Sequence, residues 1–180
     1  INIPFTVGGG IKSIDEIEAL LKAGADKVSL NSSIVANPNL INEGALAFGS
    51  QAIVAAIDAK LSGNHWEVFT HGGTKGTGLD AIKWAIQCEE NGAGELLVTS
   101  MDRDGTKSGF DNQLLMKIHE HTQIPLIASG GAGTIEHCLD AILIGKADAV
   151  LAASIFHFRE IEIPELKQKM KKAGISTRIT

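Results

Sequence analysis

The sequence predicts an α/β fold of the (β/α)8-barrel type, and three observations lead to that prediction. Six short apolar runs alternate with six amphipathic helical patterns, which is the order of a parallel sheet covered by helices. The apolar runs are nearly continuous, as in strands that are buried on both faces. The chain also repeats itself: IPFTVGGGI and GADKVSLNSS return about 120 residues later as IPLIASGGAG and KADAVLAASIF.

The strands are expected at the six apolar runs. In chain order these are Ile3 to Val7, Lys27 to Leu30, Ile53 to Ile57, Glu95 to Thr99, Leu126 to Ala128 and Ala149 to Ala152. Between them, apolar residues recur at helical spacing. Ser13 is the expected N-cap of a helix that ends before Gly24, and Thr134 is the expected N-cap of a helix that ends before Gly145.

The repeat favours a barrel over a doubly wound sheet. Its two copies span about residues 1–50 and 122–172, and a barrel that consists of two half-barrels has this twofold relation. A dinucleotide-binding sheet would carry GxGxxG with an acidic residue about 20 positions later, and the sequence lacks this pattern. We therefore expect residues 1–180 to form one domain, a partial (β/α) barrel with six βα units.

One connection between predicted elements is long. After Asp58, the segment AKLSGNHWEVFTHGGTKGTG is expected to form a β-hairpin with Trp66, Val68 and Phe69 in its returning strand. Long ordered loops at the carboxyl end of a barrel strand usually serve function.

Composition narrows the class of protein. The net charge of −5 argues against a nucleic-acid-binding surface. The apolar runs fall short of the roughly 20 residues that cross a membrane. Cys88 and Cys138 lie in predicted helices without a CxxC spacing, so we expect buried, reduced thiols and a cytoplasmic location. The histidines show no spacing that places two of them on one helical face, and we predict no metal site and no cofactor.

Polar residues that end an apolar strand face the active site in such barrels. Asp58 follows six apolar residues, and Lys60 lies two positions further along, so both side chains can face the same side. Two interpretations stay open at this point. The pair is either a salt bridge that closes the strand, or Asp58 is a general acid/base whose pKa is set by its surroundings.

The segment TSMDRDGTKSG, residues 99–109, is the second candidate. It is either a solvated turn, since Asp-Gly is a turn signal, or a lid over a phosphate group. Gly105 can offer its backbone N–H to an anion without steric hindrance.

Two glycine clusters predict a pair of phosphate cradles. VGGG with SLNSS supplies Gly10, Asn31 and Ser32. ASGGAG with LAAS supplies Gly130, Gly131, Ala153 and Ser154. Backbone N–H groups at a glycine loop and at a following helix N-terminus bind phosphate, so two such loops predict a ligand with two phosphates.

In this order and spacing, VGGGI, GADKVSLNSS, AIDAK, TSMDRDGTKSG, ASGGAG and LAASIFHF resemble the cyclase subunit of imidazole glycerol phosphate synthase over essentially all 180 residues. The resemblance implies that Asp58 is one of two catalytic aspartates. It implies substrate contacts for Lys60, Asn31, Thr99 and Asp104, one phosphate site at Gly10, Asn31 and Ser32, and another at Gly105, Gly130, Gly131, Ala153 and Ser154. Asp26 would lie on the face where a glutaminase partner docks.

The resemblance implies a lyase of the histidine pathway. With ammonia from the glutaminase, it would convert a phosphoribulosyl-formimino intermediate with two phosphates into imidazole glycerol phosphate and aminoimidazole carboxamide ribonucleotide. The chain resembles the third to eighth of eight βα units, so we expect these 180 residues alone to bind phosphate ligands without turnover. Two alternatives stay open: the sister isomerase of the pathway, and a paralogue that conducts ammonia to another amidation, such as sugar modification.

Overall fold

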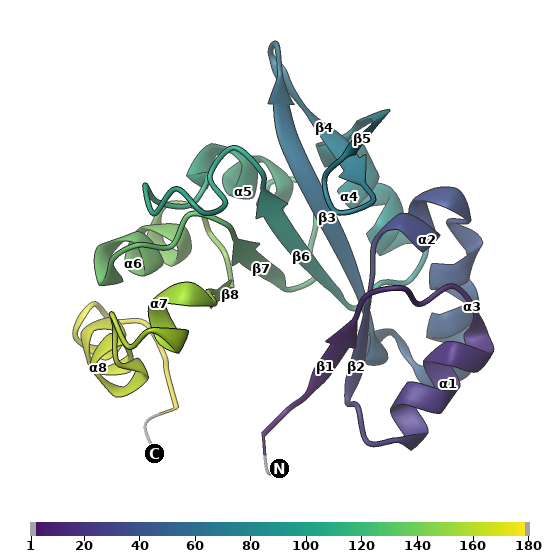
Figure 1. The fold of residues 1–180 in the computed structure, drawn as a ribbon, viewed down its shortest axis with the longest axis horizontal. Helices are drawn as coiled ribbons and strands as arrows, with labels where there is room; N and C mark the ends of the chain where they lie inside the picture. The colour runs from purple at the N-terminus through teal and green to yellow at the C-terminus, as the bar shows by residue number, and fades with distance from the viewer. Residues whose placement is uncertain (1–2, 179–180) are drawn as a thin grey trace.

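A curved parallel sheet organises the molecule. The computed structural model describes residues 3–178. Its parallel strands are adjacent in the order β1 (Thr6–Gly8), β2 (Lys27–Leu30), β3 (Ile53–Ser62), β6 (Glu95–Ser100), β7 (Leu126–Ser129) and β8 (Ala149–Leu151). Figure 1 shows the curvature, with β1 and β8 at the two ends of the sheet. This is the predicted α/β class, with a sheet that is compatible with a TIM-type barrel.

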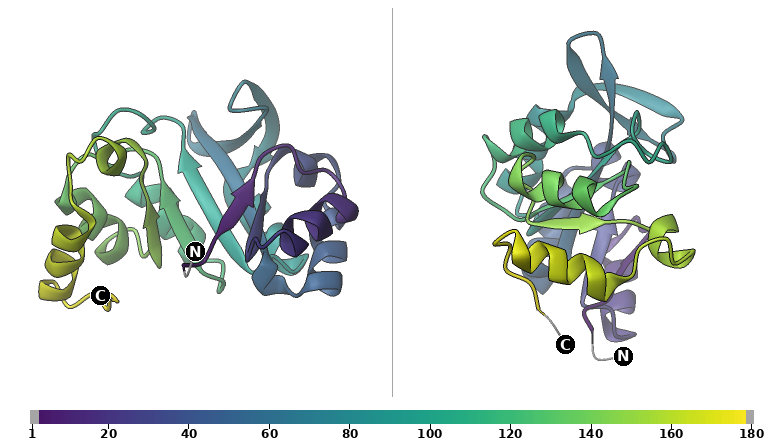
Figure 2. Two further views of the ribbon diagram at one scale, coloured as in Figure 1. Left: turned by 60° about the horizontal axis from the view of Figure 1, so that its bottom comes forward. Right: turned by 90° about the vertical axis from the view of Figure 1, so that its left-hand side faces the viewer.

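Helices cover the convex side of the sheet (Figure 2). The long ones are α1 (Ile14–Lys22), α3 (Asn39–Phe48), α4 (Ala81–Glu90), α5 (Asn112–His119), α6 (Ile135–Leu143) and α8 (Ile163–Lys172). Short helices α2 (Ser32–Ala36) and α7 (Ser154–His157) follow β2 and β8, and a 3-10 turn, η1 (Ser50–Ala52), precedes β3. Both predicted N-caps are present, since Ser13 Oγ accepts from Glu16 N and Thr134 Oγ1 accepts from His137 N.

The core lies between the sheet and its helices. Val28, Leu96 and Leu126 point toward the helices and are almost completely buried. Their neighbours on the concave side of β2, β6 and β7 are half-buried, so burial alternates along each strand. The prediction that both faces are buried is therefore correct for the convex face. On the concave face it holds for Val54 of β3 and is wrong for β2, β6 and β7, which the described residues leave partly open.

The long connection forms a three-stranded antiparallel excursion. β3 continues past Ile57 to Ser62, β4 (His65–Thr70) returns along it, and β5 (Lys75–Asp80) pairs with β4. The returning strand contains the predicted Trp66, Val68 and Phe69, and β5 is an additional strand. The predicted strand end at Ile57 is wrong, because pairing with β4 extends β3 beyond the point where β6 ends.

Other boundaries shift by a few residues. β1 begins at Thr6 rather than Ile3, and β8 ends at Leu151 rather than Ala152. Cys88 and Cys138 are buried in α4 and α6 as expected. Burial raises the pKa of the Cys88 thiol to about 12 and that of Cys138 to about 11, which disfavours the reactive thiolate. Within residues 3–178, every helix is too short or too polar to cross a membrane.

Two aspartates hold the amino ends of strands in the same way. Asp26 Oδ2 accepts a hydrogen bond of 2.7 Å from Phe5 N, just before β1. Asp148 Oδ2 accepts one of 2.9 Å from Leu126 N, at the start of β7. In each case the aspartate N–H donates back to the carbonyl of the same residue at 2.8 Å. Each aspartate thus joins the start of one strand to the start of the next.

Candidate active site

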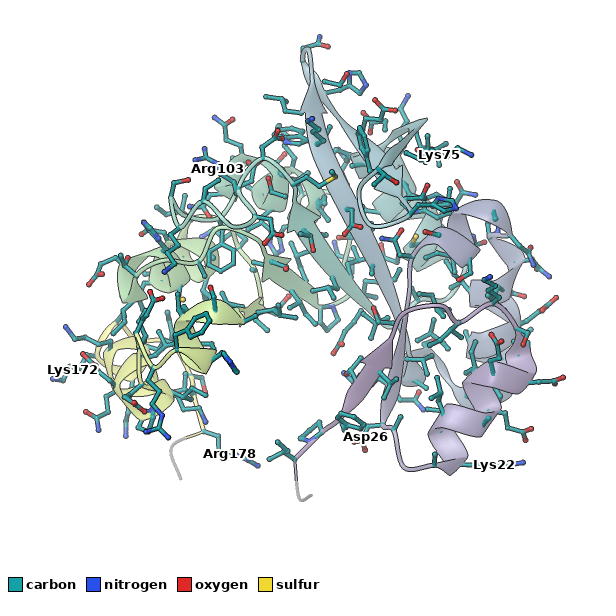
Figure 3. The ribbon with its side chains drawn as sticks, in the orientation of Figure 1. Lys22, Asp26, Lys75, Arg103, Lys172 and Arg178 are labelled. Atoms are coloured by element: carbon teal, nitrogen blue, oxygen red, sulfur yellow. The ribbon has the colours of Figure 1, made fainter. Side chains whose placement is uncertain are left out.

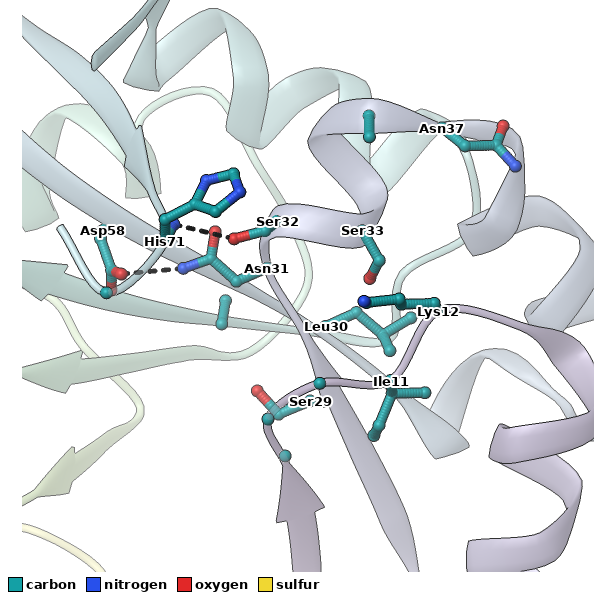
Figure 4. A pocket seen from close by; sticks show the side chains of 16 residues that line it. Ile11, Lys12, Ser29, Leu30, Asn31, Ser32, Ser33, Asn37, Asp58 and His71 are labelled. Carbon is teal, nitrogen blue, oxygen red and sulfur yellow. Dashed lines mark hydrogen bonds between the residues drawn. The ribbon is translucent and has the colours of Figure 1, made fainter. Parts of the chain in front are cut away.

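A pocket of about 810 Å3 opens beyond the ends of β1 and β2, beside the middle of β3 (Figure 4). Residues 8–12 after β1 and residues 29–33 at the end of β2 form two of its walls. Asp58 of β3 forms a third, and His71 with Gly72, from the turn between β4 and β5, form a fourth. The pocket therefore joins the first predicted phosphate cradle to the predicted catalytic carboxylate.

Asp58 is held by an amide. Asn31 Nδ2 donates a hydrogen bond of 2.8 Å to Asp58 Oδ2, while Asn31 Oδ1 is buried without a partner among the described residues. Burial raises the pKa of the Asp58 carboxyl; the Asn31 hydrogen bond lowers this pKa, and the charge of Asp104 raises it again. A carboxyl with a raised pKa and a fixed orientation is suited to accept and return protons.

The first cradle is open to a ligand. Gly9 and Gly10 have φ angles of +101° and +76°, which only glycine adopts freely, and no neighbouring atom lies within 4 Å of where a Cβ of Gly10 would be. Ser32 begins α2 beside them and accepts a hydrogen bond of 3.0 Å at its Oγ from His71 N. The glycine loop and the start of α2, with Ser32, therefore line the pocket together.

The second cradle is packed against the loop after β6. Gly130 and Gly131 have φ angles of +85° and +105°. Gly109 N donates to Gly131 O at 2.8 Å, which seats the β6–α5 loop on the β7–α6 loop. Gly105 lies in the exposed part of the former loop, and Ala153 with Ser154 lie exposed at the start of α7. These residues lie outside the Asp58 pocket.

The remaining predicted site residues lie near Asp58 to different degrees. Thr99 is the register partner of Asp58 on the neighbouring strand β6. Asp104, from the loop that follows β6, acts on the pKa of Asp58 through its charge. Lys60 is exposed, and its Nζ lies 6.0 Å from the centre of the Phe69 ring instead of in a salt bridge with Asp58.

Comparisons with known proteins decide the family. The family model described as histidine biosynthesis protein matches residues 1–162. The imidazole glycerol phosphate synthase subunit HisF of Cytophaga hutchinsonii is 60% identical over 178 residues, which cover 99% of this chain and 71% of that protein. The subunit HisF of Flavobacterium psychrophilum is 58% identical over 179 residues, with the same two coverages. The chain belongs to the HisF family. This confirms the resemblance to the cyclase subunit and places the chain among enzymes of histidine biosynthesis.

Three features of this chain were not predicted. Lys12 and His71 both line the pocket beside the first cradle. On the concave face, Lys27 at the start of β2 forms an ion pair with Glu95 at the start of β6, across β3. Lys12 directly follows VGGGI, which could have signalled a cradle residue, whereas the place of His71 depends on how the β4–β5 turn folds back. Within residues 3–178 there is no group of three or more potential metal ligands.

Proposed function

We propose that this chain forms the third to eighth βα units of a HisF cyclase subunit. The subunit uses ammonia from a glutaminase partner to convert the diphosphorylated formimino intermediate into imidazole glycerol phosphate and aminoimidazole carboxamide ribonucleotide. The observation that carries the proposal is the pocket in which Asp58, fixed by Asn31, lies beside the first cradle. The 58–60% identity to named HisF subunits supports the reaction.

The order of strands supports a substrate that spans the sheet. The first cradle follows β1 and β2, and the second follows β7 and β8. Asp58 and Thr99 lie between them, on β3 and β6. A ligand with a phosphate in each cradle would therefore pass its reacting centre over Asp58. Binding energy from the two phosphates would hold that centre in place for proton transfer.

The internal repeat supports two equivalent phosphate sites. Gly9–Gly10 and Gly130–Gly131 both have left-handed backbone conformations at the same position after a parallel strand. Each is followed one βα unit later by a short helix, α2 or α7. The aspartates 26 and 148 clamp the strand starts of both copies in the same way. We infer that residues 1–50 and 122–172 are corresponding parts, each of two βα units, of two related half-barrels.

Within an eight-unit barrel, β1 and β8 of this chain would each pair with a further strand. Each pairs with one parallel neighbour in the described residues. In this proposal, the second catalytic aspartate comes from the first βα unit. Asp58 then transfers protons on one side of the substrate, and the other aspartate does so on the opposite side.

Turnover with ammonium salts tests the proposed reaction. The complete subunit is expected to consume the diphosphorylated intermediate and release both products when ammonium or an active glutaminase is supplied. Turnover of the aldose form without ammonia would instead support the isomerase. Stimulation of a glutaminase without cyclisation would support the ammonia-conducting paralogue. Either result would contradict the proposed cyclase.

Asp26 and Asp148 provide a matched test of the partner face. Figure 3 shows Asp26 by the start of β1, at the edge of the sheet opposite Arg103 of the β6–α5 loop. Because each aspartate accepts a strand-start hydrogen bond, Asp26→Ala and Asp148→Ala are each expected to cost about 1 kcal/mol of unfolding free energy. If Asp26 also contacts the glutaminase, its substitution alone will weaken the complex, by about tenfold or more in Kd.

The measurements are thermal unfolding and titration of each variant with the glutaminase. Asp26→Asn retains a hydrogen-bond acceptor and removes the charge, so it separates the strand clamp from a charged contact. A complex affinity of Asp26→Ala and Asp26→Asn equal to that of the wild type would assign Asp26 to the fold alone.

A further inference from the structure

The first cradle contains basic groups that the family motifs do not include. Of the sixteen residues that line the pocket, three are ionisable: Lys12, Asp58 and His71. Figure 4 shows Lys12 and His71 on different walls of the pocket, with Ser32 between them and Asp58 bonded to Asn31. Two basic side chains therefore surround the cradle, and the acid lies beside it.

The turn that carries His71 is built to face this cradle. His71, Gly72 and Gly73 have consecutive left-handed φ angles of 56°, 64° and 81°. A left-handed conformation is uncommon for a residue other than glycine, and it persists where the surroundings enforce it. Here the turn is closed by Thr74 Oγ1, which donates to His71 O at 2.8 Å, and is joined to the cradle by the His71 N bond to Ser32 Oγ.

The imidazole has one nitrogen available to a ligand. His71 Nδ1 lies 3.0 Å from Thr70 Oγ1, which fixes the ring relative to the end of β4. Among the described residues, Nε2 has no hydrogen-bond partner. Because His71 lines the pocket, a ligand that reaches this Nε2 could accept a hydrogen bond from it or donate one to it.

Lys12 approaches from the opposite side. It immediately follows the glycine loop, and its backbone N–H donates at 2.6 Å to Glu16 Oε2 in the first turn of α1. This bond fixes the backbone, while the lysine ammonium forms no ion pair among the described residues. A phosphate dianion on the glycine loop would meet the Lys12 ammonium as a point charge.

We propose that Lys12 and His71 are phosphate ligands of the first cradle and set its affinity for a phosphomonoester end of the substrate. The proposal rests on the proposed function for the identity of the substrate, and adds to it two side chains that clamp the phosphate from two walls. The β3–β4–β5 excursion thereby acquires a role in substrate binding: it delivers His71 to the pocket.

The test compares single variants of the complete subunit. Lys12→Gln removes the charge, and His71→Asn removes the imidazole while retaining a residue that tolerates the left-handed conformation. Each is expected to raise KM for the diphosphorylated substrate about tenfold, as expected for the loss of one charge-assisted hydrogen bond, and to change kcat much less. Lys12→Arg is expected to restore most of the affinity.

Lys22→Gln and His65→Asn are the matched controls. Lys22 is exposed in α1, in an ion pair with Glu18, and His65 begins β4 away from the pocket. Both controls are expected to leave KM and kcat at wild-type values. An unchanged KM in Lys12→Gln and His71→Asn would overturn the proposal, as would equal falls in kcat and thermal stability without a rise in KM.

Binding of inorganic phosphate tests the role of Lys12 and His71 independently of the proposed reaction. Binding of phosphate is measured directly by titration calorimetry for the wild type and for each variant, without any turnover. Weaker phosphate binding in Lys12→Gln and His71→Asn supports the clamp even if cyclisation fails. Wild-type phosphate binding in both variants would overturn the clamp even if cyclisation by the wild type is observed.

Discussion

Asp58→Asn is expected to lower kcat for cyclisation by about 10²- to 10⁴-fold, with a small change in KM. Asparagine has nearly the same shape as aspartate, and it can still accept the hydrogen bond that Asn31 Nδ2 donates. It cannot take up or release a proton at the pH of the assay. The loss would therefore measure proton transfer rather than substrate positioning, provided that the bound substrate keeps its place on the two cradles.

Asp58→Asn is also expected to raise the free energy of unfolding at pH values above the pKa of Asp58 in the folded protein. Burial, the largest cause, raises the pKa of Asp58 in the folded state above its unfolded value. The folded state then holds this proton more tightly than the unfolded state. Stability from this group is fully present below the unfolded pKa and is lost as pH rises through the folded pKa. The amide introduced by Asp58→Asn does not ionise, so the variant avoids that loss.

Thermal unfolding at several pH values checks the direction of this stability change. The Tm difference between Asp58→Asn and the wild type should be small near pH 3 and should grow as pH rises toward neutrality. Asn31→Ala provides the second arm, because it removes the hydrogen bond that lowers the Asp58 pKa. The acid limb of the pH–rate profile of Asn31→Ala should therefore move to higher pH. A wild-type kcat in Asp58→Asn would remove Asp58 from the mechanism.

The fold was predictable where local signals agreed with tertiary structure. Ser13 and Thr134 cap helices as their positions indicate, and the apolar runs from residues 27, 95 and 126 form parallel strands. The end of β3 was not predictable from its apolar run. Its continuation to Ser62 depends on the pairing of Leu61 with Trp66 in β4, which is a contact between strands and not a property of the run itself.

The candidate site likewise contains residues whose positions were predictable from the sequence and residues whose positions were not. Asn31, Ser32 and Asp58 follow apolar runs directly, and parallel strands bring such positions to one edge of a sheet. His71 reaches that edge through an antiparallel excursion, so sequence spacing says little about its place. Lys60 was expected beside Asp58 because residues two apart share a strand face. The Phe69 ring on the adjacent strand instead lies beneath its ammonium, and the side chain extends toward solvent.

Gly131→Ala is expected to be the most destabilising single-methyl substitution of the second cradle, with a loss of about 3 kcal/mol or more. Two causes act together at this position. Its φ of +105° is unfavourable for any residue with a Cβ, and that Cβ would lie 2.2 Å from Gly109 O. Relief would require the β6–α5 loop to move, and Gly105 would move away from the cradle with it.

Gly10→Ala and Gly94→Ala separate the two causes. Gly10, at the matching position of the first cradle, has a φ of +76° and open space around the added methyl group. Its substitution should cost about 1 kcal/mol, or about 2–4 °C in Tm. Gly94 lacks the positive φ, but its added Cβ would lie 2.1 Å from Ser50 O. The stability loss in Gly94→Ala therefore measures a clash with the backbone alone, without the cost of a left-handed backbone conformation.

Thermal unfolding of the three variants shows whether the positive φ or the backbone clash costs more stability. If the causes at Gly131 are independent, its Tm loss should approach the sum of the losses for Gly10→Ala and Gly94→Ala. Phosphate titration of the same proteins adds a functional reading. Gly10→Ala should affect the first cradle alone, and Gly131→Ala should affect the second. A Gly131→Ala loss no greater than that of Gly10→Ala would mean that the β6–α5 loop yields easily. The tight seating of this loop on the second cradle would then not hold Gly105 in place for a phosphate.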